Sequence, residues 1–330
     1  MVNRNDFNNY VDLCFGKFGD RVKHWVTLNE PWSFSYGGYA MGFLAPGRCS
    51  SWQQLSCTGG DSATEPYLVA HYQLLAHAAA VKLCRSKYER RQMGKIGIAL
   101  ISEWFEPYSS TREDYEAALR GLDFMFGWFM DPLTTGDYPQ IMRSLVGSRL
   151  PTFSKEQSNL LIESFDFLGL NYYSAVYAAN APNSFTLIPS YITDSRVNQL
   201  SERDGVPIGP QEQKMEHKRY MDYSKVWVSE VNNSTLTLLD ALDDNMRIAY
   251  HRDHLCFLQQ AIEGGVKVGG YFIWSLLDNF EWSDGYSVRF GINYVDYKNG
   301  LKRYPKHSAV WFTDFLRKHN QNSQPTISDH

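Results

Sequence analysis

Apolar and polar positions along the chain alternate between helical and strand-like spacing. Helical spacing predicts helices over residues 7–18, 66–88, 113–130, 241–264 and 306–318. Short apolar runs predict strands over residues 24–28, 95–101, 165–173 and 268–277. Residues 31–65 and the polar stretch 174–223 are typical of long loops. Helices that alternate with strands favour an α/β fold with a parallel sheet.

Composition narrows the class of protein. The 330 residues are 43% hydrophobic, which suffices for one large core or two medium ones. Aromatic residues make up 15%, which suits either an aromatic core or a site where rings stack on sugars. The net charge is −4 and no long basic stretch occurs, so nucleic acid is not expected as a partner. No apolar run reaches about 18 residues, so no membrane span is expected.

The cysteines and two asparagines indicate a secretory history. Cys49 and Cys57 lie in the loop GRCSSWQQLSCTGG, close enough to close a small ring. The other three cysteines lie in apolar helical patterns and are expected to be buried thiols: Cys14, Cys84 and Cys256. Asn232 and Asn233 in NNST are candidate glycosylation acceptors. The first residues carry no apolar signal core.

The strongest candidate for chemistry is Glu30, at the end of the predicted strand in WVTLNEP. The residue before a proline is pushed towards extended geometry, so Glu30 is expected to project from the strand end. A carboxyl group there, beside an amide and several aromatic residues, can act as a general acid. The alternative is a strand-end glutamate in a solvated turn.

Two further clusters lie at strand ends. Glu281 and Trp282 close the stretch FIWSLLDNFEW, where a carboxylate could bind sugar hydroxyls while the indole stacks on a sugar ring. Asn171 and Tyr173 alternate on one face of the strand LGLNYY. Taken singly, each cluster could equally belong to the edge of an aromatic core.

Together these stretches resemble glycoside hydrolase family 1, the retaining β-glucosidases, and most closely its plant members. The resemblance covers about 1–210 and 229–318, and it rests on stretches such as HWVTLNEPW, GWFMDPLTTGDYP, SFDFLGLNYYS and GYFIWSLLDNFEW. It implies a (β/α)₈ barrel, hydrolysis of terminal β-D-glucosides and a two-carboxylate mechanism. It implies no metal and no organic cofactor. The resemblance also suggests that the protein follows a secretory route or is located in a plastid.

The resemblance assigns roles to individual residues. Glu30 matches the acid/base, and Asn29 matches the amide that holds the sugar 2-hydroxyl. Tyr173, on the strand that also carries Asn171, matches the tyrosine that hydrogen-bonds the nucleophile. The remaining matched sugar-binding residues are Trp274 under the ring, Glu281 and Trp282 on its hydroxyls, and Phe290 beside its hydroxymethyl group. Cys49 and Cys57 match a loop disulfide of the plant enzymes, and Asp278 and Arg289 are expected to be structural.

The sequence departs from the family pattern in two places. The first predicted helix leads directly into the family's fourth barrel strand, so about strands 4, 5, 6 and 8 are expected in one partial barrel domain over residues 1–330. The family's T-E-N-G motif, which supplies the nucleophile, does not occur; the chain has EQKMEHKRYMDYSKVWV in that region. An incomplete barrel would leave open strand edges, which predicts self-association.

Glu230 admits two interpretations. In the first, VWVSE is the family's seventh strand and Glu230 is the nucleophile. In the second, SEVNNSTLTL matches the loop after the nucleophile, and Glu230 is a loop acid. The second preserves the longer match and is preferred. The leading function is therefore a retaining β-glucosidase with impaired turnover. The alternatives are a non-catalytic sugar-binding or scaffold protein, and a fragment of a longer β-glucosidase.

Overall fold

The computed structural model describes residues 4–182, 188–209, 230–231 and 237–322. The chain divides into two compact units, Met1–Val226 and Trp227–His330. The single domain expected over residues 1–330 stays a prediction. Asn232 and Asn233, the candidate glycosylation acceptors, lie outside the described residues.

The first unit contains most of the regular structure. Its α-helices are α1 (Arg4–Phe18), α2 (Pro31–Tyr39), α3 (Glu65–Leu83), α4 (Glu89–Gln92), α5 (Arg112–Leu122), α6 (Trp128–Thr134), α7 (Gln140–Val146), α8 (Lys155–Leu161) and α9 (Tyr191–Asp194). Its strands are β1 (His24–Asn29), β2 (Lys95–Pro107), β3 (Phe167–Asn180), β4 (Val197–Leu200), β5 (Glu202–Arg203) and β6 (Val206–Pro207).

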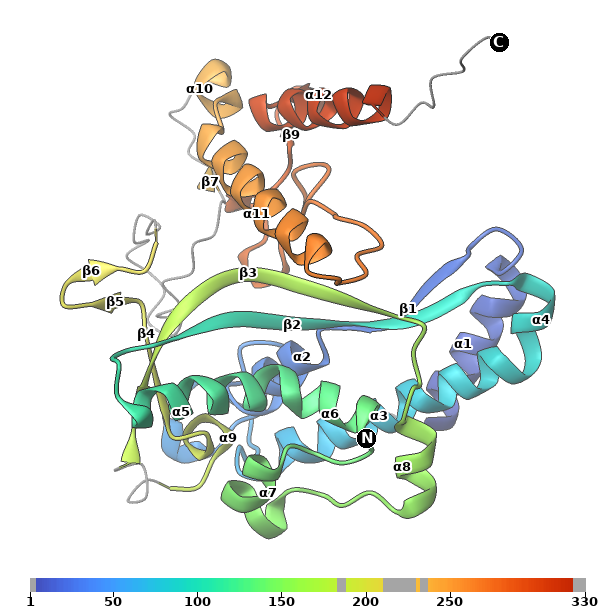
Figure 1. Ribbon diagram of the computed structural model, residues 1–330, viewed down its shortest axis with the longest axis vertical. Coiled ribbons are helices and arrows are strands. Elements are labelled where there is room, and N and C mark those ends of the chain that lie inside the picture. Colours follow the sequence, from blue (N-terminus) through green and yellow to red (C-terminus); the bar gives the residue numbers. More distant parts are fainter. Residues whose placement is uncertain (1–3, 183–187, 210–229, 232–236, 323–330) are drawn as a thin grey trace. The chain divides into compact units, whose positions relative to one another are not determined.

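Four of these strands form one sheet in the order β1-β2-β3-β4. The pairs β1–β2 and β2–β3 are parallel, and β4 pairs antiparallel with β3. Figure 1 shows α3, α5 and α6 lying along one face of this sheet. Parallel strands joined by helices place all their carboxyl ends at one edge, which is where barrel enzymes carry their active sites.

The core of this unit packs α3 and α6 against β2. Pro66 occupies the first turn of α3, where its missing N–H costs no hydrogen bond, and the helix continues with alanine and leucine. Tyr67, Leu74 and Trp128 are fully buried together with Ile98 of β2. Burial of each such side chain contributes roughly 1.5–3 kcal/mol to the free energy of folding. The packing of these side chains therefore holds the sheet and its strand ends in place.

A buried histidine fastens β1 to α3. The Nδ1 atom of His77 lies 2.6 Å from Oγ1 of Thr27, and the side chain of His77 is fully buried. Burial lowers the pKa of His77 from 6.5 to about 4, because the charged imidazolium would lose its hydration. The neutral imidazole is therefore the form that fits between β1 and α3.

This depressed pKa predicts a pH-dependent stability. The unfolded chain takes up a proton on His77 near pH 6.5 and the folded chain only near pH 4, so the stabilisation is present above pH 6.5 and is lost as the pH falls towards 4. For this residue the loss is about 3 kcal/mol. In urea titrations, the free energy of unfolding of the parent protein should fall between pH 7 and pH 4. In His77→Gln the fall should be smaller by about that amount. Parallel curves for the two proteins would contradict the assignment.

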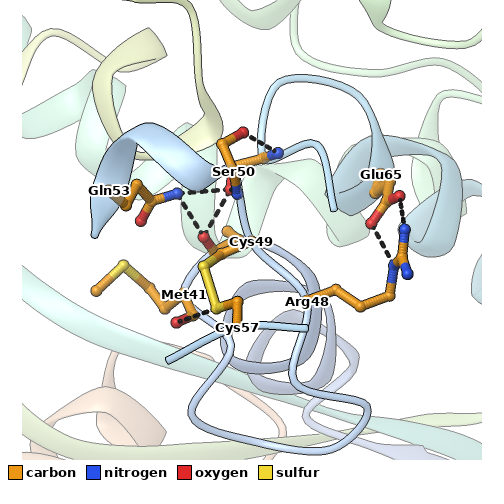
Figure 2. The surroundings of a disulfide bond; sticks show 9 residues. Met41, Arg48, Cys49, Ser50, Gln53, Cys57 and Glu65 are labelled. Atoms are coloured by element: carbon orange, nitrogen blue, oxygen red, sulfur yellow. Dashed lines mark hydrogen bonds and ion pairs between the residues drawn. A yellow bond between two sulfur atoms is a disulfide. The ribbon is translucent and has the colours of Figure 1, made fainter. Parts of the chain in front are cut away.

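A disulfide closes the loop that follows α2. Figure 2 shows the bond between Cys49 and Cys57, with the ion pair of Arg48 and Glu65 beside it. Gly42 has a φ of +72°, and a Cβ atom there would lie 2.1 Å from Sγ of Cys57, so only glycine fits this approach. The disulfide expected from the resemblance is confirmed.

The second unit is smaller and has little sheet. Its elements are β7 (Glu230–Val231), α10 (Leu238–Leu242), α11 (Asn245–Glu263), β8 (Val288–Arg289), β9 (Asn293–Asp296), β10 (Lys302–Pro305) and α12 (His307–Asn322). The pairs β7–β8 and β9–β10 are antiparallel. A capping box between Thr237 and Asp240 begins α10.

The strand predicted over residues 268–277 is wrong. Within the described part of the chain, this segment makes one isolated bridge, between Leu277 and Asn293, and no strand ladder. Phe272 is 92% exposed and Leu276 is 67% exposed. A strand is stabilised by pairing with its neighbours, so an apolar run without a ladder partner does not become one. The three parallel strands β1, β2 and β3 confirm the other strand predictions.

Two of the predicted loops contain regular structure. Residues 31–65 include α2, and residues 174–223 include the end of β3, α9 and β4 to β6. The described strands form one four-stranded sheet and three two-stranded sheets, and none of these closes into a barrel. No helix among the described residues is long and apolar enough to cross a membrane.

Candidate active site

Glu30 lies directly after β1, at the carboxyl end of the parallel sheet. Its backbone N–H donates to the carbonyl oxygen of Ala99 on β2 at 2.9 Å, which extends the strand pairing by one residue. The chain then turns into α2 with Glu30 as the N-cap residue, at φ +48° and ψ +58°. The extended geometry expected before Pro31 is therefore wrong. A left-handed conformation is costly for a residue with a side chain and is common at functional sites.

Three side chains donate hydrogen bonds to the carboxylate of Glu30. Oε1 accepts from Nδ2 of Asn171 at 2.7 Å and from the hydroxyl of Tyr173 at 3.1 Å. Oε2 accepts from Oγ of Ser33 at 2.7 Å. Since Glu30 is only 9% exposed, these donors replace the water that a buried carboxylate loses.

The core beneath Glu30 fixes the direction of α2. Trp32 is buried and stacks on Tyr36, and its indole N–H donates to the hydroxyl of Tyr191. Gln73 of α3 donates to the carbonyl oxygen of Pro31 at 3.2 Å. Both contacts hold the first turn of α2, and with it the backbone of Glu30.

The side chains of Asn29 and Asn171 contact each other in the structure. Nδ2 of Asn171 is 3.0 Å from Oδ1 of Asn29, as well as 2.7 Å from Glu30. Tyr173 donates to Glu30 in this structure, whereas the resemblance gave it a contact with the nucleophile. The three residues predicted around Glu30 are thus brought together in the first unit.

Two residues near this site were missed from the sequence. Ser33 lies three residues after Glu30. In a helix that begins after Glu30, this spacing puts Ser33 in the first turn, beside the N-cap residue, and it was the available signal for Ser33. Glu103 is 2% exposed near the end of β2, where Oε1 accepts from Oγ of Ser174 at 3.1 Å. A lone carboxylate inside the apolar run KIGIALISEWF was the available signal for Glu103.

The second unit holds the other predicted sugar-binding residues. The indole N–H of Trp274 donates to Oε2 of Glu281 at 3.1 Å, which joins the predicted ring platform to the predicted hydroxyl acceptor. Glu281 is buried, while the rings of Trp274 and Trp282 are each more than half exposed. Phe290 is half-buried, and its carbonyl oxygen accepts from the backbone N–H of Ser275 at 3.0 Å. Exposed indoles beside a buried carboxylate can bind a polyhydroxylated ring.

Glu230 begins the two-residue strand β7, where its backbone pairs with Arg289 of β8 in antiparallel orientation. The preceding Val-Trp-Val run lies outside the described residues. This location differs from the carboxyl end of a parallel strand, where Glu30 lies. In the described ranges, no group of three or more histidine, cysteine, aspartate or glutamate side chains could hold a metal ion.

Comparison with known proteins decides the family. The model of the family described as "Glycosyl hydrolase family 1" matches residues 3–321. The chain belongs to glycosyl hydrolase family 1. This membership confirms the predicted family and its α/β-barrel fold class, although the described strands here do not close the barrel.

The similar family members are plant β-glucosidases. The chain is 54% identical to β-glucosidase 24 of Oryza sativa subsp. japonica, over 94% of this chain and 66% of that protein. It is 47% identical to raucaffricine-O-β-D-glucosidase of Rauvolfia serpentina, over 98% of this chain and 67% of that protein. The chain therefore spans about two thirds of the length of the relatives that it matches.

Solved structures of the family agree with this fold. A rice β-glucosidase superposes with a TM-score of 0.87 and 42% identity, over 94% of this chain and 70% of that chain. A β-glucosidase from the fungus Humicola insolens, crystallised with glucose, superposes with a TM-score of 0.85 and 34% identity, over 96% of this chain and 69% of that chain.

The contacts of Asn171 predict a measurable contribution to stability. Asn171→Ala removes the donor at 2.7 Å from the buried Glu30 carboxylate. A lost hydrogen bond to a charged group should lower the free energy of unfolding by about 1.5–3 kcal/mol in urea titrations. Ser144→Ala, at an exposed position on α7, should change it by less than about 0.5 kcal/mol. Equal effects of the two substitutions would contradict the importance of this bond.

Proposed function

We propose that this chain acts on terminal β-D-glucosides, as a retaining glycoside hydrolase whose acid/base is Glu30. The observation that carries the proposal is the buried Glu30 carboxylate at the carboxyl end of β1, oriented by Asn171, Tyr173 and Ser33. A carboxyl group fixed in this way can be aimed at a glycosidic oxygen.

In the first step, Glu30 would donate its proton to the glycosidic oxygen while the bond from that oxygen to the anomeric carbon breaks. The aglycone leaves as an alcohol, and an attacking group bonds to the anomeric carbon from the opposite face. In the second step, Glu30 as a carboxylate would accept a proton from the water that displaces this group. Asn29 would hold the sugar 2-hydroxyl beside Asn171.

Within the second unit, we propose that the matched residues form a glucose-binding surface. Trp274 would lie under the sugar ring, and Glu281 would accept hydrogen bonds from its hydroxyls, because the indole N–H bond at 3.1 Å already orients that carboxylate. Trp282 and Phe290 would contact the remaining edge. Supporting this view, the similar relatives include β-glucosidases, and one solved relative holds glucose.

The attacking carboxylate is the weak element of this site. A retaining enzyme needs two carboxyl groups about 5 Å apart, and the T-E-N-G motif does not occur in this sequence. We propose that Glu230 is not the nucleophile, because its backbone pairs in a short antiparallel strand and the longer match makes it a loop residue. The chain would then turn over substrate only when a small anion takes the nucleophile's place.

Anion rescue tests this proposal. Release of the aryl alcohol from an aryl β-glucoside should be slow in water and should accelerate with azide, which attacks the anomeric carbon, displaces the aryl oxygen and yields the α-glucosyl azide. Glu30→Gln should lower the azide-dependent kcat/KM by about 10²–10⁴-fold, because the leaving aryl oxygen loses its general acid. Glu230→Gln should leave the rate within about twofold, which serves as the matched control because the proposal gives Glu230 no part in the reaction.

Each outcome separates the competing functions. Loss of activity in Glu230→Gln with recovery by azide would identify Glu230 as the nucleophile and contradict the proposal. Glucoside binding without turnover, with or without azide, would favour a sugar-binding protein without catalysis.

We also propose that the chain self-associates through the edge of its parallel sheet. Among the described strands, β1 pairs on one side only, with β2. Val26 on β1 and Val22 just before it have exposed apolar side chains. An edge strand with exposed apolar residues is a template for pairing with a second copy.

Sedimentation over a range of concentrations tests the edge pairing. The protein should associate as its concentration rises, and Val26→Lys should favour the monomer because a charged side chain on an edge strand opposes pairing. Val310→Lys, at an exposed position of α12 in the other unit, is the control and should leave the association unchanged. A monomer at every concentration would contradict self-association.

A further inference from the structure

Asp278 lies at the centre of a buried polar network in the second unit. Its side chain is fully buried, and Oδ2 accepts from Nη1 of Arg289 at 2.6 Å and from the backbone N–H of Val295 at 3.1 Å. Oδ1 accepts from the backbone N–H of Gly291 at 3.0 Å and lies 3.9 Å from Nζ of the buried Lys306. A buried carboxylate with this many partners fixes each of them strongly.

The partners of Asp278 belong to a different segment of the chain from Asp278 itself. Two backbone hydrogen bonds join the same two segments. The N–H of Ser275 donates to the carbonyl oxygen of Phe290, and the N–H of Ile292 donates to the carbonyl oxygen of Ser275. A Cβ atom on Gly291 would lie 2.1 Å from the backbone nitrogen of Asp278, so the two segments touch backbone to backbone. Asp278 therefore joins segment 274–281 to segment 289–295.

All four predicted glucose-binding residues of this unit lie on or beside these two segments. Trp274 and Glu281 flank Asp278 on the first segment, with Trp282 directly after it, and Phe290 lies between Arg289 and Gly291 on the second. The bond between Trp274 and Glu281 fixes the first segment internally, but it does not reach Phe290. The carboxylate of Asp278 spans both segments and accepts from Arg289 and Gly291. The side chain of Asn293 adds one bond between them, from Nδ2 to the carbonyl oxygen of Leu276 at 2.8 Å.

We propose that Asp278 is the positioning residue of the glucose-binding surface, and this inference rests on the proposed function. The side chain of Asp278 is fully buried, so it would not contact a sugar itself. It sets the separation between the Trp274–Trp282 segment and Phe290, and it therefore decides whether the indoles, the Glu281 carboxylate and the phenyl ring can contact one sugar together. Its role thus differs from a purely structural ion pair, which would stabilise the unit without affecting the affinity for a glucoside.

Asp278→Asn tests this role with two readouts. The substitution keeps the size of the side chain and removes the charge that faces Arg289 and Lys306. The dissociation constant of a non-hydrolysable aryl thio-β-glucoside, followed by tryptophan fluorescence, should rise about tenfold, since hydrogen bonds to a charged group are lost. In the ligand-free protein, the amides of Glu281 and Gly285, which bond to each other's carbonyls, should exchange hydrogen at least about tenfold faster.

Ser308→Ala is the matched control. Ser308 is fully buried and donates to Asp244, which ties α12 to the start of α11 without touching segment 274–281. This variant should lower the stability of the unit and leave both the affinity and the exchange of residues 281–285 within about twofold of the parent. If Asp278→Asn also unprotects α11 and α12, Arg289→Lys, which keeps the charge, should accelerate exchange in residues 281–285 alone.

The two readouts keep the inference separate from the proposed function. Failure of the parent protein to bind any glucoside would overturn the proposed function, and the exchange experiment would still decide the positioning role. Unchanged exchange at residues 281–285 in Asp278→Asn, or an equal loss of affinity in Ser308→Ala, would overturn the role of Asp278.

Discussion

The parallel pairing of β1, β2 and β3 is the constraint on which the candidate site depends. Glu30 follows β1 and Asn171 belongs to β3, so their hydrogen bond crosses over β2. It forms because Asn29 is paired with Ala99, and Asn171 with Ile101 two residues further along β2. A shift of one residue in the register between β2 and β3 would turn Asn171 and Tyr173 to the opposite face and leave the Glu30 carboxylate buried without them.

Much of this arrangement follows from patterns in the sequence. The apolar runs of β1, β2 and β3 identify the parallel strands, and the polar residues at their ends identify Glu30 and Asn171. The pairing of Cys49 with Cys57 followed from the family resemblance and is present. The left-handed backbone of Glu30 and its contact with Ser33 were not predicted, because both depend on how α2 packs through Trp32 against Tyr191. Local preference before proline does not contain that tertiary information.

The second unit shows the opposite case. Residues 268–277 have the composition of a strand, yet a strand needs a neighbour, and the described residues of this unit provide one bridge at Leu277. Order in this region comes from backbone hydrogen bonds to residues 290–293 and from the buried side-chain network of Asp278, Arg289 and Lys306. Periodicity does not reveal which buried charge will organise a loop. The structural role expected for Asp278 therefore did not specify the two segments that its contacts join.

We propose that the Glu30 carboxyl group lies within hydrogen-bond reach of the position that the glycosidic oxygen of a bound β-glucoside would take. An affinity label of the N-bromoacetyl-β-glucosylamine type tests this most directly, because its amide nitrogen takes the place of the glycosidic oxygen and its electrophilic carbon lies two bonds beyond, within reach of the acid/base. Peptide mapping after labelling should find one adduct, on Glu30 in the stretch HWVTLNEPW, which glucose prevents and which Glu30→Gln lacks. An adduct confined to another carboxylate, or labelling that glucose does not reduce, would contradict the claim.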